Sequence, residues 1–201
     1  MALNFANNNS LSAITAKPSG LSGGSMNLIS TQTASSSATL SFTSGIDDTY
    51  DEYVFKFYDI HAATDDVEFQ FNVSIDGGSN YNVAKTTTYF RAYNYEDGSD
   101  AALGYRTPRD LAQGTGFQAL TEGQGNGNDE SCSGQLTIFN PSDTTFVKHF
   151  IARNSMYGRT DYEMDIYVAG YANTTSAVNA IQFKMSSGNI DSGVIKLYGI
   201  S

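Results

Sequence analysis

The chain has 201 residues and a formal net charge of -10, from 21 acidic and 11 basic side chains. This excess of negative charge repels phosphate backbones and anionic lipid surfaces, so we expect neither nucleic acid nor a membrane as a partner. Tyrosine and phenylalanine are abundant, at 13 and 12 residues, while charged residues make up only 16% and tryptophan is absent. Such a composition favours strands and turns and is typical of an all-β domain with a buried core.

The single cysteine and the hydropathy of the chain argue against a disulfide-bonded, metal-binding or membrane-spanning protein. Cys132 is the only cysteine, which excludes an intramolecular disulfide, and the Gly-, Asn- and Ser-rich sequence around it offers no set of metal ligands. No stretch approaches the roughly 18 consecutive apolar residues that a membrane helix needs, and the first residues lack a basic and apolar leader. We therefore expect no cofactor, no metal and folding in a reducing cytoplasm.

Residues 1–37 are rich in Asn, Ser and Gly and show no period of 2 or 3.6 residues. Isolated apolar residues are spaced along them, so we predict an extended N-terminal arm that lies on a neighbouring surface, with a frayed terminus as the alternative. The candidate anchors are Leu3, Phe5, Leu11, Ile14, Leu28 and Ile29. Residues 38–201 then form the folded domain.

The centre of that domain is a pair of apolar runs. Apolar side chains take every second position from Val67 to Ile75, which predicts a strand with one buried and one solvated face. Aromatic residues alternate in the same way from Tyr53 to Tyr58. Because the residues between the runs, 59–66, are polar, we predict that the two runs pair as an antiparallel hairpin.

Short strands separated by turn signals follow along the rest of the chain. They are expected at residues 38–42, 81–95, 135–139, 145–153, 162–171, 178–185 and 194–200, with short edge strands at 103–106 and 117–120. About eight to ten strands of this kind predict an all-β fold, namely a jelly-roll-like β-sandwich or a related barrel.

The longest irregular region lies between Glu96 and Gln135 and is rich in glycine. Because loops of this length are usually functional or disordered, we predict that it forms a partner-facing surface. The candidate contact residues on it are Tyr105, Arg106, Arg109 and Phe117. With Arg153 and Arg159, these arginines are scattered along the sequence and predict no basic cluster.

The sequence offers few candidates for catalysis or metal binding. His61 lies near Asp59, Asp65 and Asp66, but acidic residues in a turn usually cap it and stay hydrated, so we interpret this segment as a solvated corner. His149 alternates with apolar residues, which is typical of a structural histidine in a strand.

Two acidic pairs invite comparison with a glycosidase, which uses two carboxylates. They are Asp47 with Asp48 and Asp51 with Glu52. Their spacing does not fix their separation in space, and no nucleophile elbow, phosphate-binding loop or dinucleotide fingerprint occurs. We therefore predict that the chain is not an enzyme. The 13 tyrosines suit stacking on sugars or subunit contacts, but positions in half-buried strands explain most of them.

Several stretches resemble virion structural proteins of tailed bacteriophages, particularly phages of marine bacteria. They are the opening MALNF, LISTQTASSSATLSF at 28–42, FTSGIDDTYDEYVFKFYDIHAATDDVEFQF at 42–71 and SSGNIDSGVIKLYGIS at 186–201. The resemblance implies a β-rich, non-enzymatic and multi-copy component of the virion, assembled in the host cytoplasm.

The resemblance leaves two positions on the particle open. A capsid decoration or cement protein would dock on the outer shell through its arm and one face of the sandwich, and this is the expectation we favour. A tail-fibre or receptor-binding domain would present its loops and surface tyrosines to host glycans. A third hypothesis is a carbohydrate-binding module or glycosidase. The partners would be phage capsid or tail proteins, and symmetry about shell or fibre axes suggests a homo-oligomer, for example a trimer.

Overall fold

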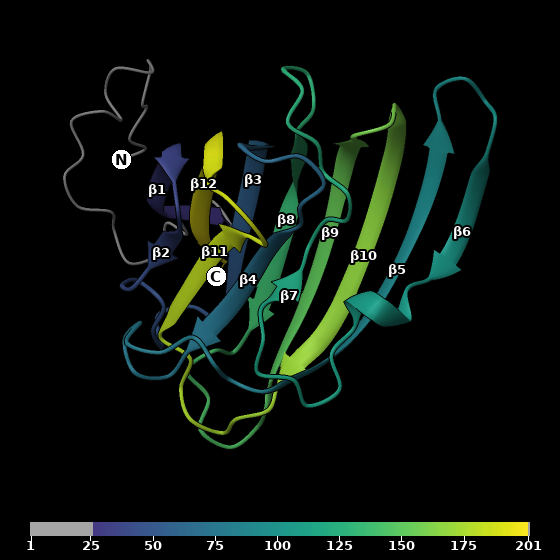
Figure 1. The fold of residues 1–201 in the computed structure, drawn as a ribbon. Helices are drawn as coiled ribbons and strands as arrows, with labels where there is room; N and C mark the ends of the chain where they lie inside the picture. Colours follow the sequence, from purple (N-terminus) through teal and green to yellow (C-terminus); the bar gives the residue numbers. More distant parts are fainter. Residues whose placement is uncertain (1–25, 201) are drawn as a thin grey trace, which may run out of the picture.

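The structure, a computed structural model, describes residues 26–200 as an all-β fold of two antiparallel sheets (Figure 1). The strands are β1 (Met26–Ser37), β2 (Leu40–Phe42), β3 (Glu52–Ala62), β4 (Phe69–Ser74), β5 (Lys85–Tyr95), β6 (Ala101–Tyr105), β7 (Gln118–Ala119), β8 (Cys132–Phe139), β9 (Lys148–Gly158), β10 (Tyr162–Ala172), β11 (Ala180–Met185) and β12 (Ile190–Ile200). A 3₁₀ turn, η2, spans Thr107–Arg109. The all-β class is confirmed.

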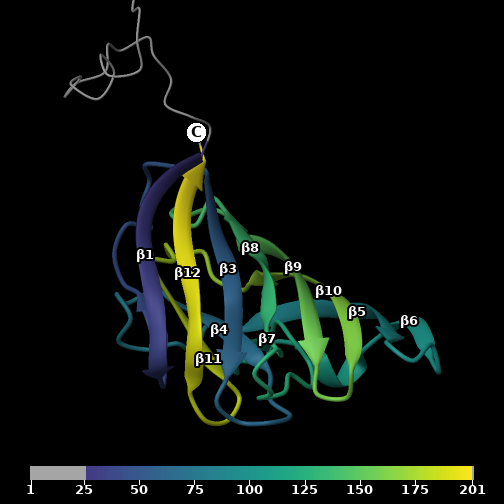
Figure 2. The same cartoon turned by 90° about the horizontal axis from the view of Figure 1, so that it is seen from above.

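The two sheets differ in size. The large sheet has eight strands in the order β1-β12-β3-β8-β9-β10-β5-β6, and the small sheet has four in the order β2-β11-β4-β7. Figure 2 shows the large sheet as one curved row from β1 to β6. In Figure 1 the small sheet crosses the part of the large sheet that holds β12, β3 and β8, while β10, β5 and β6 extend beyond it.

The core between the sheets is centred on Phe183 of β11, which is fully buried. Its ring lies 5.4 and 5.3 Å, between centroids, from Phe55 and Phe57 of the large sheet, and it stacks on Phe69 of its own sheet at 5.7 Å. Phe42 approaches edge-on at 6.2 Å. Aromatic rings from both sheets therefore meet at one side chain, which joins the two layers.

The predicted hairpin between residues 53–58 and 67–75 is wrong. The first run belongs to β3 in the large sheet, where β12 and β8 already occupy both of its edges, and the second belongs to β4 in the small sheet. The runs instead face each other across the core, with Phe57 and Phe69 5.1 Å apart between ring centroids. Face-to-face packing buries both apolar faces, whereas a hairpin alone would leave both of them uncovered.

The segment between these runs changes sheet through irregular backbone. Asp59 and Asp66 have positive φ angles of 49° and 58°. Asp59 lies in a bulge of β3, opposite a second bulge in β12 at Gly193, whose φ is 124°. A Cβ on Gly193 would come within 2.7 Å of the Asp59 carbonyl oxygen, so only glycine fits this position.

The expected solvated face of β4 is also largely buried. Val67, Phe69, Phe71 and Val73 point inward as predicted, but Ile75 is exposed. On the other face Asn72 is fully buried and donates hydrogen bonds to the carbonyl oxygens of Tyr81, at 2.7 Å, and Thr115, at 3.0 Å. Asn72 Oδ1 also accepts a hydrogen bond from the buried amine of Lys85, at 2.5 Å. The segments that follow β4 in the chain therefore cover the face that the alternating pattern predicted to be exposed to solvent.

Part of the predicted arm belongs to the large sheet. Residues Met26–Ser37 form β1, an edge strand that pairs with β12 from Met26↔Ile200 to Ser37↔Ile190. Of the predicted anchors, Ile29 packs against the chain's own core, while Leu28 is 56% exposed. Leu3, Phe5, Leu11 and Ile14 lie outside the described residues.

Replacing Phe183 with alanine should destabilise the fold by about 3–5 kcal/mol, because the substitution leaves a cavity where five aromatic rings converge. Urea unfolding followed by tyrosine fluorescence measures this change. Phe146→Ala is the control, since Phe146 is 70% exposed and should change the unfolding free energy by about 0.5 kcal/mol or less. Equal losses in the two variants would contradict the central position of Phe183.

The buried amine of Lys85 should make stability depend on pH. Burial lowers its pKa from 10.5 to about 7. Between these values the unfolded chain holds a proton that the folded chain has released, so stability should rise with pH, by up to about 1.4 kcal/mol per pH unit. Urea unfolding at pH 7 and pH 9 should show this rise in the wild type and lose most of it in Lys85→Met. Lys56→Met, on the half-exposed face of β3, should retain it; an unchanged rise in Lys85→Met would show that another group titrates.

Candidate functional site

The segment from Glu96 to Gln135 is only partly a surface. Its beginning, which includes β6, is exposed, and β6 and β7 form edge strands of the two sheets as predicted. Residues 118–125 are buried, however, and Gln118, Thr121 and Gln124 hold them against the sheets through side-chain hydrogen bonds. For example, Gln124 Nε2 donates to the Ile60 carbonyl oxygen at 2.6 Å. This stretch therefore fixes the loop in place.

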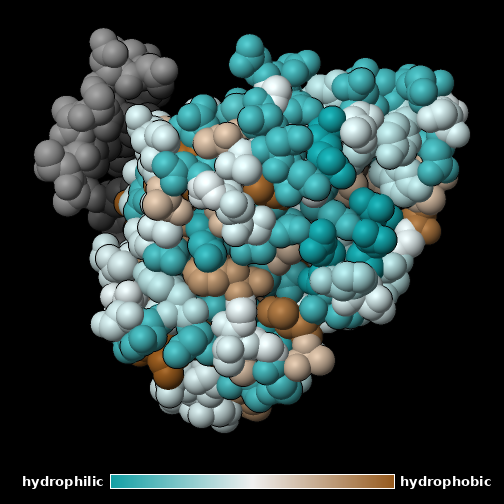
Figure 3. Space-filling view, in the orientation of Figure 1, coloured by the Kyte–Doolittle hydropathy of each residue, from teal (hydrophilic) through white to brown (hydrophobic). Residues whose placement is uncertain are grey.

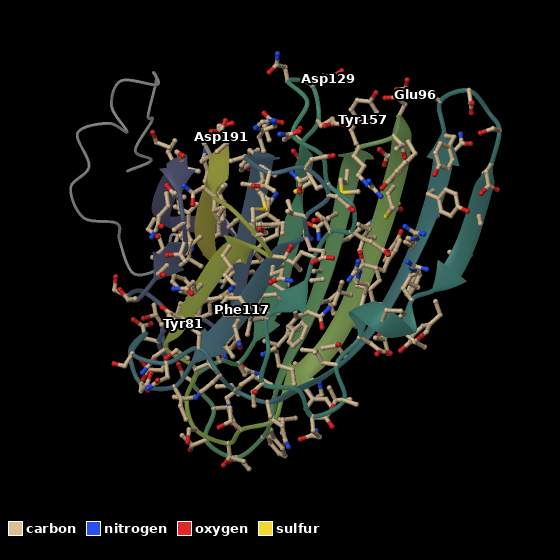
Figure 4. All side chains as sticks on the ribbon, in the orientation of Figure 1. Tyr81, Glu96, Phe117, Asp129, Tyr157 and Asp191 are labelled. Carbon is tan, nitrogen blue, oxygen red and sulfur yellow. The ribbon has the colours of Figure 1, made fainter. Side chains whose placement is uncertain are left out.

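The four candidate contact residues of this segment separate into three places. Tyr105 is exposed on β6 and donates a hydrogen bond to Asp110 at 2.5 Å. Phe117 lies beside β7, with the Lys184 amine 4.5 Å from its ring centroid (Figure 4). Arg106 and Arg109 come together, since both of them contact the carboxylate of Glu122.

Arg109 lines a polar pocket, and Arg106 reaches the same pocket through its contact with Glu122. We call it the arginine–tyrosine pocket; its volume is about 370 Å³, and its lining residues are Asp66, Arg91, Tyr93, Tyr95, Arg109, Glu122, Gly123, Arg159, Thr160 and Tyr162. It lies on the inner side of β5 and β10, where the large sheet extends beyond the small one. Figure 3 shows strongly hydrophilic side chains over this part of the molecule.

The prediction that the arginines are scattered is wrong. The chain has five arginines, and four of them gather at this pocket: Arg91, Arg109 and Arg159 line it, and Arg106 pairs with the lining residue Glu122. Sheet pairing and the loop bring together residues that are up to 68 positions apart in sequence. Arg153 is the exception: it lies on the outer face of β9 and pairs with Asp165, with Nη2 2.8 Å from Oδ2.

Glu122 is the centre of the charge network. Its side chain is 8% exposed, and its carboxylate accepts two hydrogen bonds from the Arg106 guanidinium, one of them at 3.1 Å from Nε. Arg91 Nη1 lies 3.3 Å and Arg109 Nε 3.5 Å from the same carboxylate. Burial opposes ionisation of Glu122, but the hydrogen bond from Arg106 and the three positive charges outweigh it, so the pKa of Glu122 lies below its ordinary 4.5.

Local structure explains how the two loop arginines reach one carboxylate. Arg106 precedes the 3₁₀ turn Thr107–Arg109, and the Arg109 backbone N–H donates to the Arg106 carbonyl oxygen at 2.9 Å. A 3₁₀ turn has three residues per turn, so positions 106 and 109 lie on the same side. Pro108 favours the start of such a turn. Arg109 also reaches Glu68, with Nη2 2.8 Å from Oε1.

Three tyrosines form the wall of the pocket. Arg91, Tyr93 and Tyr95 alternate on β5 and share its inner face. Tyr93 and Tyr95 meet edge to face at 5.9 Å between ring centroids, and Tyr95 lies 5.3 Å from Tyr162. The guanidinium of Arg91 lies 5.0 Å from the Tyr93 ring centroid. The pocket therefore combines aromatic faces with charged hydrogen-bond donors.

The opposite, outer face of the large sheet carries a row of aromatic side chains. Tyr105, Phe90, Tyr167 and Arg153 are neighbours across β6, β5, β10 and β9. Phe90 and Tyr167 are stacked at 4.9 Å between centroids, and the Arg153 guanidinium lies 4.9 Å from the Tyr167 ring centroid. Leu103 and Ile151, on the same outer side, are 74% and 53% exposed. This face is a second surface suited to contact with a partner.

The remaining sequence candidates have structural contacts. His61 Nε2 lies 2.9 Å from the Gly127 carbonyl oxygen and Nδ1 lies 3.4 Å from Asp191, while Asp66 pairs with Arg159 at 3.0 Å. His149 is on the outer face of β9 with its ring against Tyr171. Glu96, Asp129 and Asp191 lie at one end of the large sheet (Figure 4). Within residues 26–200, no group of three His, Cys, Asp or Glu side chains is arranged to hold a metal ion.

The acidic pairs of the glycosidase hypothesis lie at the start of β3. The side chain of Asp47 accepts hydrogen bonds from the Thr49 backbone N–H, at 2.9 Å, and from the Tyr53 hydroxyl, at 3.0 Å. The hydrogen bonds from Thr49 and Tyr53 lower the pKa of Asp47. Asp48 and Asp51 are exposed and Glu52 is half-buried. Asp47 thus closes the turn before β3.

Sequence reasoning missed Arg91, Tyr93, Tyr95, Glu122 and Tyr162. A usable signal was present for three of them, because positions 91, 93 and 95 alternate along one strand and so share a face. Glu122 gave no such signal, since it is a single acidic residue in a stretch rich in Gly and Gln.

Comparison of the chain with protein-family models, curated proteins and solved structures found no match. No helix in the described part of the chain is long and apolar enough to cross a membrane.

Replacing Glu122 with glutamine should destabilise the protein by about 1.5–3 kcal/mol at pH 7, because three guanidinium groups lose their buried carboxylate. The pKa of Glu122 is lowered in the folded state, so its contribution is present above pH 4.5 and is lost as the pH falls through the lowered value. Urea unfolding of wild type and variant should therefore differ most at neutral pH and converge in acid.

Asp165→Asn is the matched control, because it removes the partner of the exposed Arg153, whose side chain is 63% exposed. This change should cost about 1 kcal/mol or less. If the two variants lose equal stability, Glu122 does not organise the loop.

Proposed function

We propose that this protein is a non-enzymatic virion component of a tailed bacteriophage and that it acts as a receptor-binding, tail-fibre-type module for host-surface glycans. The resemblance in the sequence suggests the virion context. The observation that carries the binding role is the arginine–tyrosine pocket, in which three arginines and three tyrosines line one cavity.

The pocket has the chemistry that sugar recognition requires. Sugars present flat, weakly polar ring faces, which pack on aromatic side chains, and hydroxyl groups, which exchange hydrogen bonds with charged side chains. The half-buried Tyr93 and Tyr95 supply the ring faces, with the buried Tyr162 behind Tyr95, while Arg159 and Asp66 supply donors and acceptors. A volume of about 370 Å³ is within the range of pockets that hold small ligands and would hold one or two sugar residues.

The proposed architecture is a jelly-roll-like sandwich. Early strands pair with late ones in nested fashion, β1 with β12, β2 with β11 and β5 with β10, as expected when a long hairpin is wound across two sheets. In this arrangement β10 and β5 lie next to each other close to the β6 edge of the large sheet, and the residues of the pocket come from these two strands and the loop that crosses them.

Capsid decoration is the second candidate function, and the outer aromatic row supports it. Exposed Phe90, Tyr105 and Ile151 lie on an outer sheet face that is free of the small sheet. A decoration protein would dock this face on the shell, together with residues 1–25. The two functions use opposite faces, so single substitutions separate them.

Tyr95→Ala should weaken glycan binding about tenfold, because it removes an aromatic face from the pocket. Glycan-array screening of the full chain, followed by calorimetry on the best ligand, measures the effect. Tyr167→Ala, in the outer row, is the control and should leave glycan affinity unchanged. Sugar release should be absent, and turnover that Asp51→Asn or Glu52→Gln abolishes would contradict the non-enzymatic assignment.

The decoration alternative predicts the reverse pattern. The measurement is the occupancy of the protein on phage particles, counted by electron microscopy. Occupancy would fall in Tyr167→Ala and after deletion of residues 1–25, a deletion that leaves β1 intact. It would be unchanged in Tyr95→Ala. That result, with no glycan bound on the array, would overturn the receptor-binding proposal.

A further inference from the structure

The arginine–tyrosine pocket is the place where this acidic chain concentrates positive charge. The chain carries a net charge of -10, yet four of its five arginines are gathered here against three carboxylates, those of Asp66, Glu68 and Glu122. Gathering cations is unfavourable unless anions balance them, and the carboxylates present leave an excess of positive charge. An arrangement with this excess attracts an anionic ligand.

The guanidinium groups have unused donors. An arginine has five N–H donors. Within residues 26–200, Arg159 is paired through Nε, 3.0 Å from Asp66 Oδ1, and its side chain is 43% exposed at the pocket. Arg109 Nε is buried and, although 3.5 Å from Glu122 Oε1, makes no hydrogen bond. The hydroxyl of Tyr89, two positions before Arg91 on the same face of β5, is buried without a partner as well.

The charge balance favours one kind of anion. Arg106 already holds the carboxylate of Glu122 through two of its nitrogens, and a planar guanidinium matches a carboxylate in this way. Among the lining residues three arginines face two carboxylates, Asp66 and Glu122, so the excess is one charge. A monoanionic carboxylate fits this excess, whereas a phosphate dianion would meet the two carboxylates with a second negative charge.

We propose that the ligand of the arginine–tyrosine pocket is an acidic sugar, whose carboxylate binds Arg159 and Arg91 while its ring packs on the half-buried Tyr95. This inference rests on the proposed glycan-binding function and specifies its ligand class. Arg159 is the specificity-determining residue, because it is the most accessible of the lining arginines and is not part of the Glu122 network.

The test uses the full chain and matched ligand pairs. Oligosaccharides of galacturonic acid, of glucuronic acid and of N-acetylneuraminic acid are each compared by calorimetry with their carboxyl methyl esters, which keep the ring and lose the charge. At least one acid should bind tenfold or more tightly than its ester, and its affinity should fall as sodium chloride is raised. Arg159→Gln should lose that preference.

The chain provides a matched control variant. Arg153→Gln also removes an exposed arginine that is paired with an aspartate, but on the outer face, and should retain the preference. Circular dichroism establishes that both variants fold.

The outcomes distinguish this inference from the function on which it rests. Equal binding of acids and esters, or binding confined to neutral glycans, would overturn the acidic ligand and leave glycan binding intact. Displacement by inorganic phosphate as effective as displacement by the free acid would show a general anion site and would also overturn it. Binding of no glycan at all would overturn both proposals.

Discussion

A sheet of four strands cannot cover a sheet of eight, and this mismatch governs the structure. Under the small sheet, side chains on the inner face are apolar and meet around Phe183. Beyond it, the same face of β5 changes along its length from buried Tyr89 to half-buried Arg91, Tyr93 and Tyr95. One strand thus contributes core at one end and polar pocket at the other, because only one end has a second layer above it.

The uncovered end is held in shape by charge. Residues 118–125 form a buried segment on this side of the large sheet and bring Glu122 to the arginines. The carboxylate of Glu122 holds this region together by ion pairs, whereas Phe183 holds the centre together by apolar packing. A partly buried network of this kind gives less stability per contact than apolar packing, since each ion loses hydration. Its contribution is geometric: it holds guanidinium groups at fixed positions around a cavity.

Periodicity predicted the all-β class, most strand positions and the inward set Val67, Phe69, Phe71 and Val73, because alternation reports directly which side of a strand is buried. It could not assign β3 and β4 to different sheets, since face-to-face and edge-to-edge neighbours have the same pattern. Nor could it place β1, whose edge position needs few apolar residues. Periodicity could not predict the arginine cluster either. Arg91, Arg106 and Arg159 are brought together by contacts between segments that are distant in sequence, and local spacing does not reveal such contacts.

The position of the pocket at the end of β5 affects how the ligand specificity of the protein can evolve. Arg159 has a side chain that is 43% exposed, and substitutions at such surface positions usually alter the free energy of unfolding by only about 0.5 kcal/mol. Replacing it changes what the cavity accepts while Phe183 and its neighbours keep the two sheets together. The fold therefore separates the part of the sequence that must be preserved from the part in which new specificities can arise.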